Sequence, residues 1–192
     1  MAQRAPRPRR TPAPRTRPWT RADLARLPDD GNRYEVLGGA LLVTPQARFG
    51  HQEVAMRLLV ALREYCERYG VGVVVGPGAV PHGKSELQPD IQVIPGPVRL
   101  RAKWTQLPRP ILIVEVLSES TRARDLGIKR EAYLKWGIAE CWAVDLEACS
   151  VIVATPGQPD GIAVTDSLRW APRDGVPVFT LALARLFADP AG

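Results

Sequence analysis

Several features that would assign this chain of 192 residues to a specialised class are missing from it. No apolar run approaches the ~20 residues that a membrane-spanning helix needs. The N-terminal stretch holds no apolar segment typical of a signal peptide, so we expect a cytoplasmic location and no contact with a membrane. The three cysteines show no C-x-x-C spacing, which argues against a disulfide framework or a zinc site. We expect them to be buried free thiols.

Acidic residues are absent from the first 21 positions, which hold seven arginines and five prolines. The net charge of +6 comes from this stretch, because the residues after Arg21 carry 19 basic and 20 acidic side chains. Proline removes a backbone donor and interrupts helices, so residues 1–17 are predicted to be a disordered Arg/Pro-rich N-terminal tail. Such a tail either contacts anionic polymers such as nucleic acid or is only a solvated leader. Residues 18–192 are expected to form a single domain.

The remaining residues alternate between helical and strand-like patterns. Apolar residues recur at helical spacing over 51–70, where Gly70 marks the end of the helix. Gly38-Gly39 predicts the turn of a hairpin. Trp136 and Trp142 flank the Gly137 turn and are expected to pack together. Further helices are predicted at 21–27, 121–137 and 181–189, and strands at 34–37, 40–44, 71–75, 87–95 and 108–118. Two more strands are predicted within 140–156, joined by a turn at 146–148. We therefore expect a mixed α/β (α+β) fold, with one central mixed β-sheet flanked by helices.

Two acidic residues stand beside or inside predicted strands. In "ILIVEVLS", Glu115 lies among six aliphatic residues. An ionised, unpaired carboxylate would be too costly there, so Glu115 must be neutral, paired with a cation or bound to a metal. In "QPDIQVIP", Asp90 directly precedes a strand-forming run. Either Pro89-Asp90 is an ordinary turn, or Asp90 lies at the mouth of the sheet as a ligand for a cation.

A lysine in the next predicted helix completes a possible constellation. Asp125 and Lys129 are one helical turn apart and share a face. Because this helix must pack back on the sheet, Asp90, Glu115 and Lys129 are expected to converge at one sheet edge. Carboxylates suit a hard divalent cation, which lowers the pKa of a bound water and offsets charge on a phosphodiester. An ammonium group nearby can orient the water or neutralise the phosphate.

The order of these residues resembles that of the PD-(D/E)XK nuclease superfamily. More closely, "RYEVLGGALLV", "QPDIQVI" and the segment 112–145 resemble the Uma-type family of restriction endonucleases, from about Trp19 to the C-terminus. The resemblance implies a restriction-endonuclease-like fold and a nuclease-like domain over residues 18–192. It also implies a DNA endonuclease that depends on Mg²⁺ or Mn²⁺ and that acts as a homodimer.

Site residues follow from this resemblance position by position. Asp90 and Glu115 match the family's metal ligands, and Lys129 matches its catalytic lysine. Leu117 occupies the position where the superfamily more often has that lysine, so here the following helix supplies the amine. Glu35 matches an early acid that serves as a further ligand or orients water. Two supporting residues also match, namely Gln88 and Asp125.

The chain departs from the family at its first hairpin. Gly38-Gly39-Ala40 stands where the family commonly has Asp-Gly-Glu, so any metal contact made by those acids would be lost. The alternative function is a catalytically inactive nuclease-fold module that binds nucleic acid or a protein partner. In that alternative, Glu115 and Lys129 form a buried ion pair that fixes the helix on the sheet. His51 is expected to begin a helix rather than to bind metal.

Overall fold

The computed structural model describes residues 17–189 and is built around a six-stranded sheet. The strand order is β10-β9-β8-β7-β6-β3, and only the β7–β8 pair is parallel. The strands are β3 (Gly72–Val75), β6 (Ile91–Pro95), β7 (Leu112–Val116), β8 (Glu140–Asp145), β9 (Ser150–Thr155) and β10 (Gln158–Val164). The predicted mixed α/β fold with a central mixed sheet is therefore confirmed.

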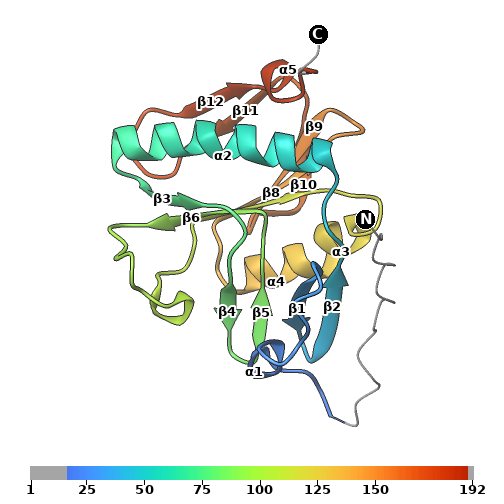
Figure 1. The fold of residues 1–192 in the computed structure, drawn as a ribbon. Helices are drawn as coiled ribbons and strands as arrows, with labels where there is room; N and C mark the ends of the chain where they lie inside the picture. Colours follow the sequence, from blue (N-terminus) through green and yellow to red (C-terminus); the bar gives the residue numbers. More distant parts are fainter. Residues whose placement is uncertain (1–16, 190–192) are drawn as a thin grey trace, which may run out of the picture.

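The first face of this sheet is covered by α2 (Phe49–Tyr69), which lies across the strands in Figure 1. Val54, Leu58 and Leu62 recur on its inner side and are buried, and Gly70 ends the helix with φ 61°. The C-terminal elements β11 (Ser167–Trp170), β12 (Phe179–Ala182) and α5 (Leu183–Leu186) pack around α2 on the same side. These residues form the larger hydrophobic core.

The second face is covered by a short helical segment and a four-stranded sheet of order β2-β1-β5-β4 (Figure 1). The strands are β1 (Arg33–Leu37), β2 (Ala40–Thr44), β4 (Val80–His82) and β5 (Ser85–Leu87). The helical segment consists of α3 (Arg122–Arg124), a kinked turn η2 (Asp125–Lys129) and α4 (Arg130–Lys135). The short helices α1 (Arg21–Leu24) and η1 (Trp104–Gln106) lie outside both sheets. A smaller apolar core on this face contains Ile113, Tyr133 and Ile138.

Several predictions about local structure were wrong. The helix predicted over 121–137 is interrupted, because Gly127 adopts φ −107° and ψ −107°. Trp136 and Trp142 do not pack together: Trp142 belongs to the core on the α2 face, whereas Trp136 packs against the core on the α4 face. Cys66 and Cys141 are buried free thiols as predicted, but Cys149 is exposed at a turn.

Near the N-terminus, Arg17 forms an ion pair with Asp23. The predicted tail lies outside the described residues except for Arg17, whose guanidinium is 2.6 Å from the Asp23 carboxylate. Among the described helices, none combines the length and the apolar character needed to cross a bilayer.

Candidate functional site

Asp90 and Glu115 lie opposite each other on adjacent strands. Ile91 pairs with Val114 in the antiparallel β6–β7 register, so one further step places Asp90 across from Glu115. Ile91 and Val114 point into the core on the α2 face, and alternation therefore turns Asp90 and Glu115 toward α4. The Val116 N–H donates a 2.8 Å hydrogen bond to Asp90 Oδ2, which holds the carboxylate against β7.

Asp90 is an ionised carboxylate surrounded by donors. Arg33 Nη2 lies 2.8 Å from Oδ1, and His51 Nε2 lies 3.2 Å from Oδ2. Burial by itself would raise the pKa of Asp90. The hydrogen bond from His51, the charge of Arg33 and the Val116 N–H outweigh it and lower the pKa of Asp90 to about 2. The turn at Pro89-Asp90 thus carries a charged, fully engaged side chain.

Lys129 joins three carboxylates inside the protein. Its Nζ lies 2.7 Å from Glu115 Oε1, 3.0 Å from Glu35 Oε1 and 3.5 Å from Asp125 Oδ1. The side chain is only 4% exposed. Burial opposes its charge, but the three carboxylates outweigh this penalty and raise the pKa of Lys129 above its ordinary value. The residue is therefore a permanent cation.

The pKa of Glu115 is shifted in the direction that disfavours its charged form. Burial is the main cause that raises its pKa to about 8; Lys129 opposes this shift, while the neighbouring Asp125 and Asp90 carboxylates add to it. Tyr133 Oη donates a 2.7 Å hydrogen bond to Glu115 Oε1, the same oxygen that Lys129 contacts. Among residues 17–189, the contacts of the Glu115 carboxylate with Tyr133 and Lys129 are both made through Oε1, and none is found at Oε2.

The two predicted supporting residues, Gln88 and Asp125, both lie beside the cluster. The backbone N–H of Gln88, rather than its side chain, donates a 2.7 Å hydrogen bond to Glu35 Oε1. The Gln88 carbonyl accepts a 2.8 Å bond from Arg33, which links it to Asp90 as well. Asp125 is buried beside Lys129, and burial raises its pKa.

Three residues at this site were not predicted. Arg33 lies two positions before Glu35 on β1, so strand alternation alone places both on one side of the strand. Tyr133 follows Lys129 by four positions, a spacing that could have revealed it. His51 lies in the first turn of α2 and contacts Asp90, which is 39 positions later in the sequence. No local sequence pattern could have predicted this contact.

The substituted hairpin turn lies away from this cluster. Gly38 and Gly39 both have positive φ, 57° and 90°, and form the tight turn between β1 and β2. Gly39 accepts a 2.9 Å hydrogen bond from the Trp19 N–H, and the Gly38 N–H donates to Ser85. The missing acids of this turn therefore remove no contact from Asp90, Glu115 or Lys129.

The cluster contains more carboxylates than permanent cations. Four buried carboxylates gather here with only two permanent cations, which leaves two negative charges when all are ionised; the acids are Glu35, Asp90, Glu115 and Asp125, and the bases are Arg33 and Lys129. Across residues 17–189, no group of three or more His, Cys, Asp or Glu side chains is arranged as a ready cage. An ion held by two carboxylates would complete its shell with water, as Mg²⁺ commonly does.

The cluster is nearly closed to solvent. Arg33 remains about one-fifth exposed, whereas Glu35, Glu115 and Lys129 are almost completely covered. Arg33 is therefore more accessible than the three side chains that it adjoins.

Comparison with known proteins finds one matching family and a similar solved structure. The family model described as "Uma2: Putative restriction endonuclease" matches residues 21–184. Among solved structures, the chain resembles a crystal structure described as a putative nuclease belonging to DUF820 from Anabaena variabilis ATCC 29413. The two share 19% sequence identity and a TM-score of 0.69, over 89% of this chain and 98% of that chain. An identity this low establishes the fold alone. No curated protein matches the chain.

Proposed function

Since this chain belongs to the Uma2 family, whose description reads "Putative restriction endonuclease", we propose that it hydrolyses phosphodiester bonds of DNA with Mg²⁺ or Mn²⁺. One observation carries the proposal: two buried carboxylates, Asp90 and Glu115, face each other beside a buried ammonium group, Lys129. Structural ion pairs need only one acid for each base. Four acids around two bases are the arrangement expected where a cation is to be added.

Asp90 and Glu115 are the proposed metal ligands. When bound, the cation would lower the pKa of a coordinated water and offset charge that develops on the phosphate. Asp90 is already ionised, and the Val116 N–H fixes its position on β7. Glu115 Oε2 is free to turn toward a ligand, while Oε1 remains tied to Lys129 and Tyr133.

Lys129 and Glu35 complete the proposed catalytic group. The ammonium of Lys129 neutralises the phosphate or orients the attacking water, because it stays protonated at the pH where the other groups act. Glu35 Oε1 lies 3.0 Å from the Lys129 ammonium and also accepts a hydrogen bond from the Gln88 N–H. Asp125 and Gln88 therefore position the catalytic side chains and do not need to touch the substrate.

The direct test is plasmid nicking with Mg²⁺ or Mn²⁺. We expect cleavage by the wild type and at least a ~100-fold loss for Asp90→Ala and Glu115→Gln, because each removes a metal ligand. The matched control is Glu140→Gln, since Glu140 is a partly buried strand glutamate that accepts a hydrogen bond from Trp142 instead. Undiminished nicking by Asp90→Ala would contradict the proposal.

A binding test separates catalysis from metal affinity. Mn²⁺ at about 100 times its Kd stabilises the folded state by about 2.7 kcal/mol, which corresponds to a rise in Tm of about 5–10 °C for a protein of this size. We expect Asp90→Ala and Glu115→Gln to lose this rise and Glu140→Gln to keep it. Differential scanning fluorimetry with and without EDTA measures the effect.

The alternative is a catalytically inactive module, and one contact favours it: Lys129 and Glu115 already form a 2.7 Å buried ion pair. In that case the wild type neither nicks DNA nor shifts its Tm with Mn²⁺, while Glu115→Gln is strongly destabilised. Retained binding to DNA, or to a protein partner, would then be the function of the fold.

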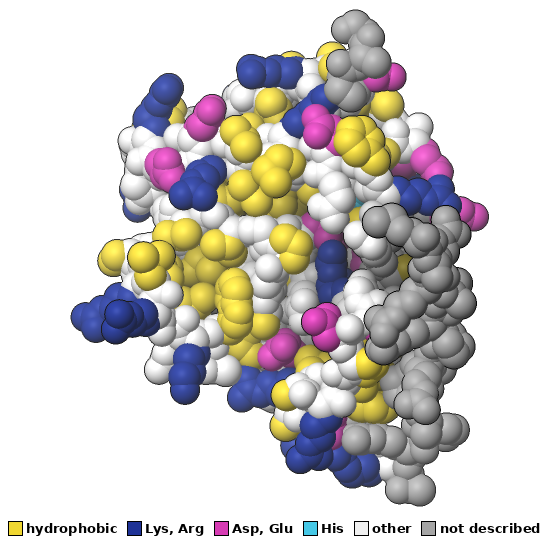
Figure 2. Space-filling model, in the orientation of Figure 1, with side chains coloured by type: hydrophobic (Ala, Val, Ile, Leu, Met, Phe, Trp, Pro, Cys, Tyr) yellow, Lys and Arg dark blue, Asp and Glu magenta, His cyan; other side chains and the backbone are white. Residues whose placement is uncertain are grey.

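We also propose that the protein acts as a homodimer, so that two sites cut the two DNA strands. The outer side of α2 exposes Phe49, Met56 and Val60, with exposed fractions of 74%, 58% and 45%. Hydrophobic side chains gather over α2 in Figure 2, beside a groove of about 410 Å³ that Met56, Val60 and Leu181 help to line. Sedimentation should find a dimer that Met56→Glu converts to a monomer; a monomeric wild type would refute this part.

We place this activity in the cytoplasm. Cys66, Cys141 and Cys149 are all free thiols, and Cys149 is exposed. An exposed thiol persists most easily in a reducing compartment. Fractionation of cells that produce the protein checks the location.

A further inference from the structure

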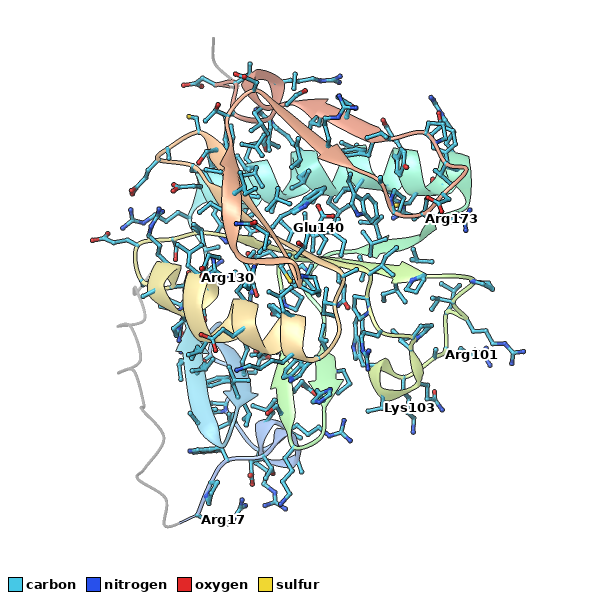
Figure 3. The ribbon with its side chains drawn as sticks, turned by 180° about the vertical axis from the view of Figure 1, so that it is seen from behind. Arg17, Arg101, Lys103, Arg130, Glu140 and Arg173 are labelled. Carbon is cyan, nitrogen blue, oxygen red and sulfur yellow. The ribbon has the colours of Figure 1, made fainter. Side chains whose placement is uncertain are left out.

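The connection between β6 and β7 is a basic segment that the proposed chemistry does not use. No acidic residue occurs between Asp90 and Glu115, whereas Arg99, Arg101, Lys103 and Arg109 all lie in this interval. All four are exposed, and within residues 17–189 none of them is paired with a carboxylate. Figure 3 shows Arg101 and Lys103 extending outward from this connection, which we call the basic loop (residues 96–111).

An aromatic pocket lies beside the basic loop, where the loop meets β4, β6 and the end of α4. Its volume is about 230 Å³, less than the ~300–1,000 Å³ of sites for drug-sized ligands. Three ring systems line it, together with an amide and a guanidinium: His82, Trp104, Trp136, Gln92 and Arg109. A pocket of this size and composition suits one planar ring system with polar edges.

The walls of this pocket are built rather than accidental. His82 stacks on Trp136 with ring centroids 4.9 Å apart and planes 11° apart. On the loop side, the Trp104 ring lies against Gly78, where any Cβ would collide with it. The buried Gln92 side chain donates a 3.0 Å hydrogen bond to the Gly78 carbonyl and so holds that backbone in place. Trp104 nevertheless remains 40% exposed, an unusual cost for such a large apolar ring.

The aromatic pocket and the candidate catalytic site share one face of the sheet. Gln92 on β6 follows Asp90, which directly precedes this strand, by two positions, or about 7 Å of extended chain. Trp136 packs edge-on against Tyr133 at 5.9 Å, and Tyr133 donates to Glu115. One extended nucleic-acid strand can therefore run from Asp90 across the pocket to the basic loop.

We propose that the aromatic pocket binds an unpaired nucleobase and that the basic loop binds the phosphates of the same strand. The preferred substrate is then single-stranded DNA, or a duplex with an unpaired segment. This inference rests on the proposed function and names the form of nucleic acid that the site takes. Stacking on an aromatic ring is available to every base but only when the base has left the duplex stack. Four unpaired cations supply a local positive charge, although the residues after Arg21 as a whole carry 19 basic and 20 acidic side chains.

Fluorescence anisotropy with a labelled oligonucleotide tests the pocket. Binding is measured in EDTA, so that no cleavage occurs, with a single strand and with the matching duplex. The wild type should bind the single strand more tightly, and Trp104→Ala should weaken that binding about tenfold, the usual effect of removing one base–aromatic stack. Trp104→Phe should restore most of the affinity. Leu100→Ala is the matched control, because Leu100 is a fully exposed apolar residue of the same loop.

Salt dependence tests the basic loop independently. The logarithm of affinity falls with the logarithm of salt concentration by about 0.7 for each phosphate neutralised on a single strand. Arg99→Ala/Arg101→Ala should therefore reduce the slope by about 1.4. Arg63→Ala/Arg68→Ala removes the same charge from the exposed side of α2 and should leave the slope unchanged.

The outcomes separate this inference from the proposed function. Cleavage that requires Asp90, combined with single-strand affinity that Trp104→Ala does not change, overturns the pocket and leaves the nuclease intact. A loss of affinity in Trp104→Ala in a protein that never nicks DNA supports the pocket and overturns catalysis. Equal binding of duplex and single strand by the wild type also overturns the inference.

Discussion

The two faces of the central sheet differ in what they bury. The face toward α2 buries aliphatic and aromatic side chains from α2, β11, β12 and α5 in one continuous core. The face toward α4 buries a smaller apolar core and, beside it, the cluster of Glu35, Asp90, Glu115, Asp125 and Lys129. Apolar burial stabilises without direction, whereas buried charges stabilise only while every partner is present. The first face therefore stabilises the fold, whereas the second face contains a charged site whose burial costs part of that stability.

The largest change should come from Lys129→Met. This substitution keeps the length of the side chain but leaves three buried carboxylates without their cation, which we expect to cost about 3–5 kcal/mol of unfolding free energy. Urea denaturation measures it. Lys135→Met on α4 is the control, because Lys135 is largely exposed and its loss should change stability by no more than about 0.5 kcal/mol. Equal stability of the two variants would remove the distinction between the faces.

A substitution on the opposite face should lower the unfolding free energy almost as much but leave metal binding unchanged. Leu58 is completely buried under α2, and Leu58→Ala should lower the unfolding free energy by about 3 kcal/mol. Because no side chain of the charged cluster contacts it, the Mn²⁺-induced rise in Tm should persist. Loss of that rise in Leu58→Ala would mean that the two faces are energetically coupled.

The contributions of Asp90 and Glu115 to stability should depend on pH in opposite directions. The pKa of Asp90 is lowered from 3.8 to about 2, so its ionisation stabilises the fold above pH 3.8 by on the order of 2 kcal/mol. This contribution disappears as the pH falls through about 2, and Asp90→Asn should flatten the acid limb. The pKa of Glu115 is raised from 4.5 to about 8, so its contribution is complete below pH 4.5 and is lost as the pH rises through about 8.

Urea denaturation without metal, repeated over a range of pH, measures both the acidic and the alkaline part of the stability curve. Glu115→Gln should abolish the decline between pH 4.5 and 8 and leave the acid limb intact. Glu67→Gln is the control, since Glu67 is an exposed carboxylate on α2. A wild-type profile that rises from pH 4.5 to 8 would contradict the assignment for Glu115.

The smallest effect should come from an ion pair on the surface. Arg63 and Glu67 lie 2.7 Å apart on α2, but both are more than 60% exposed. Arg63→Ala should therefore change the unfolding free energy by less than about 0.5 kcal/mol, in contrast to Lys129→Met. A loss above 2 kcal/mol would show that exposure does not explain the difference between the two pairs.

Much of the fold follows from local patterns in the sequence. Gly38-Gly39 has the positive φ that a tight hairpin turn requires, and α2 repeats its apolar residues at helical spacing until Gly70 ends it. Glu115 could be singled out because a carboxylate among aliphatic residues needs a partner. The antiparallel pairing of β6 with β7 then brings Asp90 opposite it.

Contacts between distant segments could not be predicted in this way. Arg33 meets Asp90 across 57 positions, and Lys129 meets Glu35 across 94. Both contacts depend on how the β1–β2 hairpin docks on the α4 face, which no local periodicity encodes. The separation of Trp136 from Trp142 is similar: they are neighbours in sequence, but the turn at Gly137 sends their side chains to opposite faces of the sheet.

The supply of the amine from a helical segment has a consequence for how relatives of this protein are found. A lysine on β7 would be tied to a single spacing from Glu115, because strand residues alternate strictly. Here the amine comes from the segment after the strand, which is kinked at Gly127, and it still lies 2.7 Å from Glu115. Strand alternation therefore does not fix the number of residues between Glu115 and Lys129. A search that counts positions from the strand glutamate would overlook such proteins, whereas one that compares where the nitrogen ends in space would recover them.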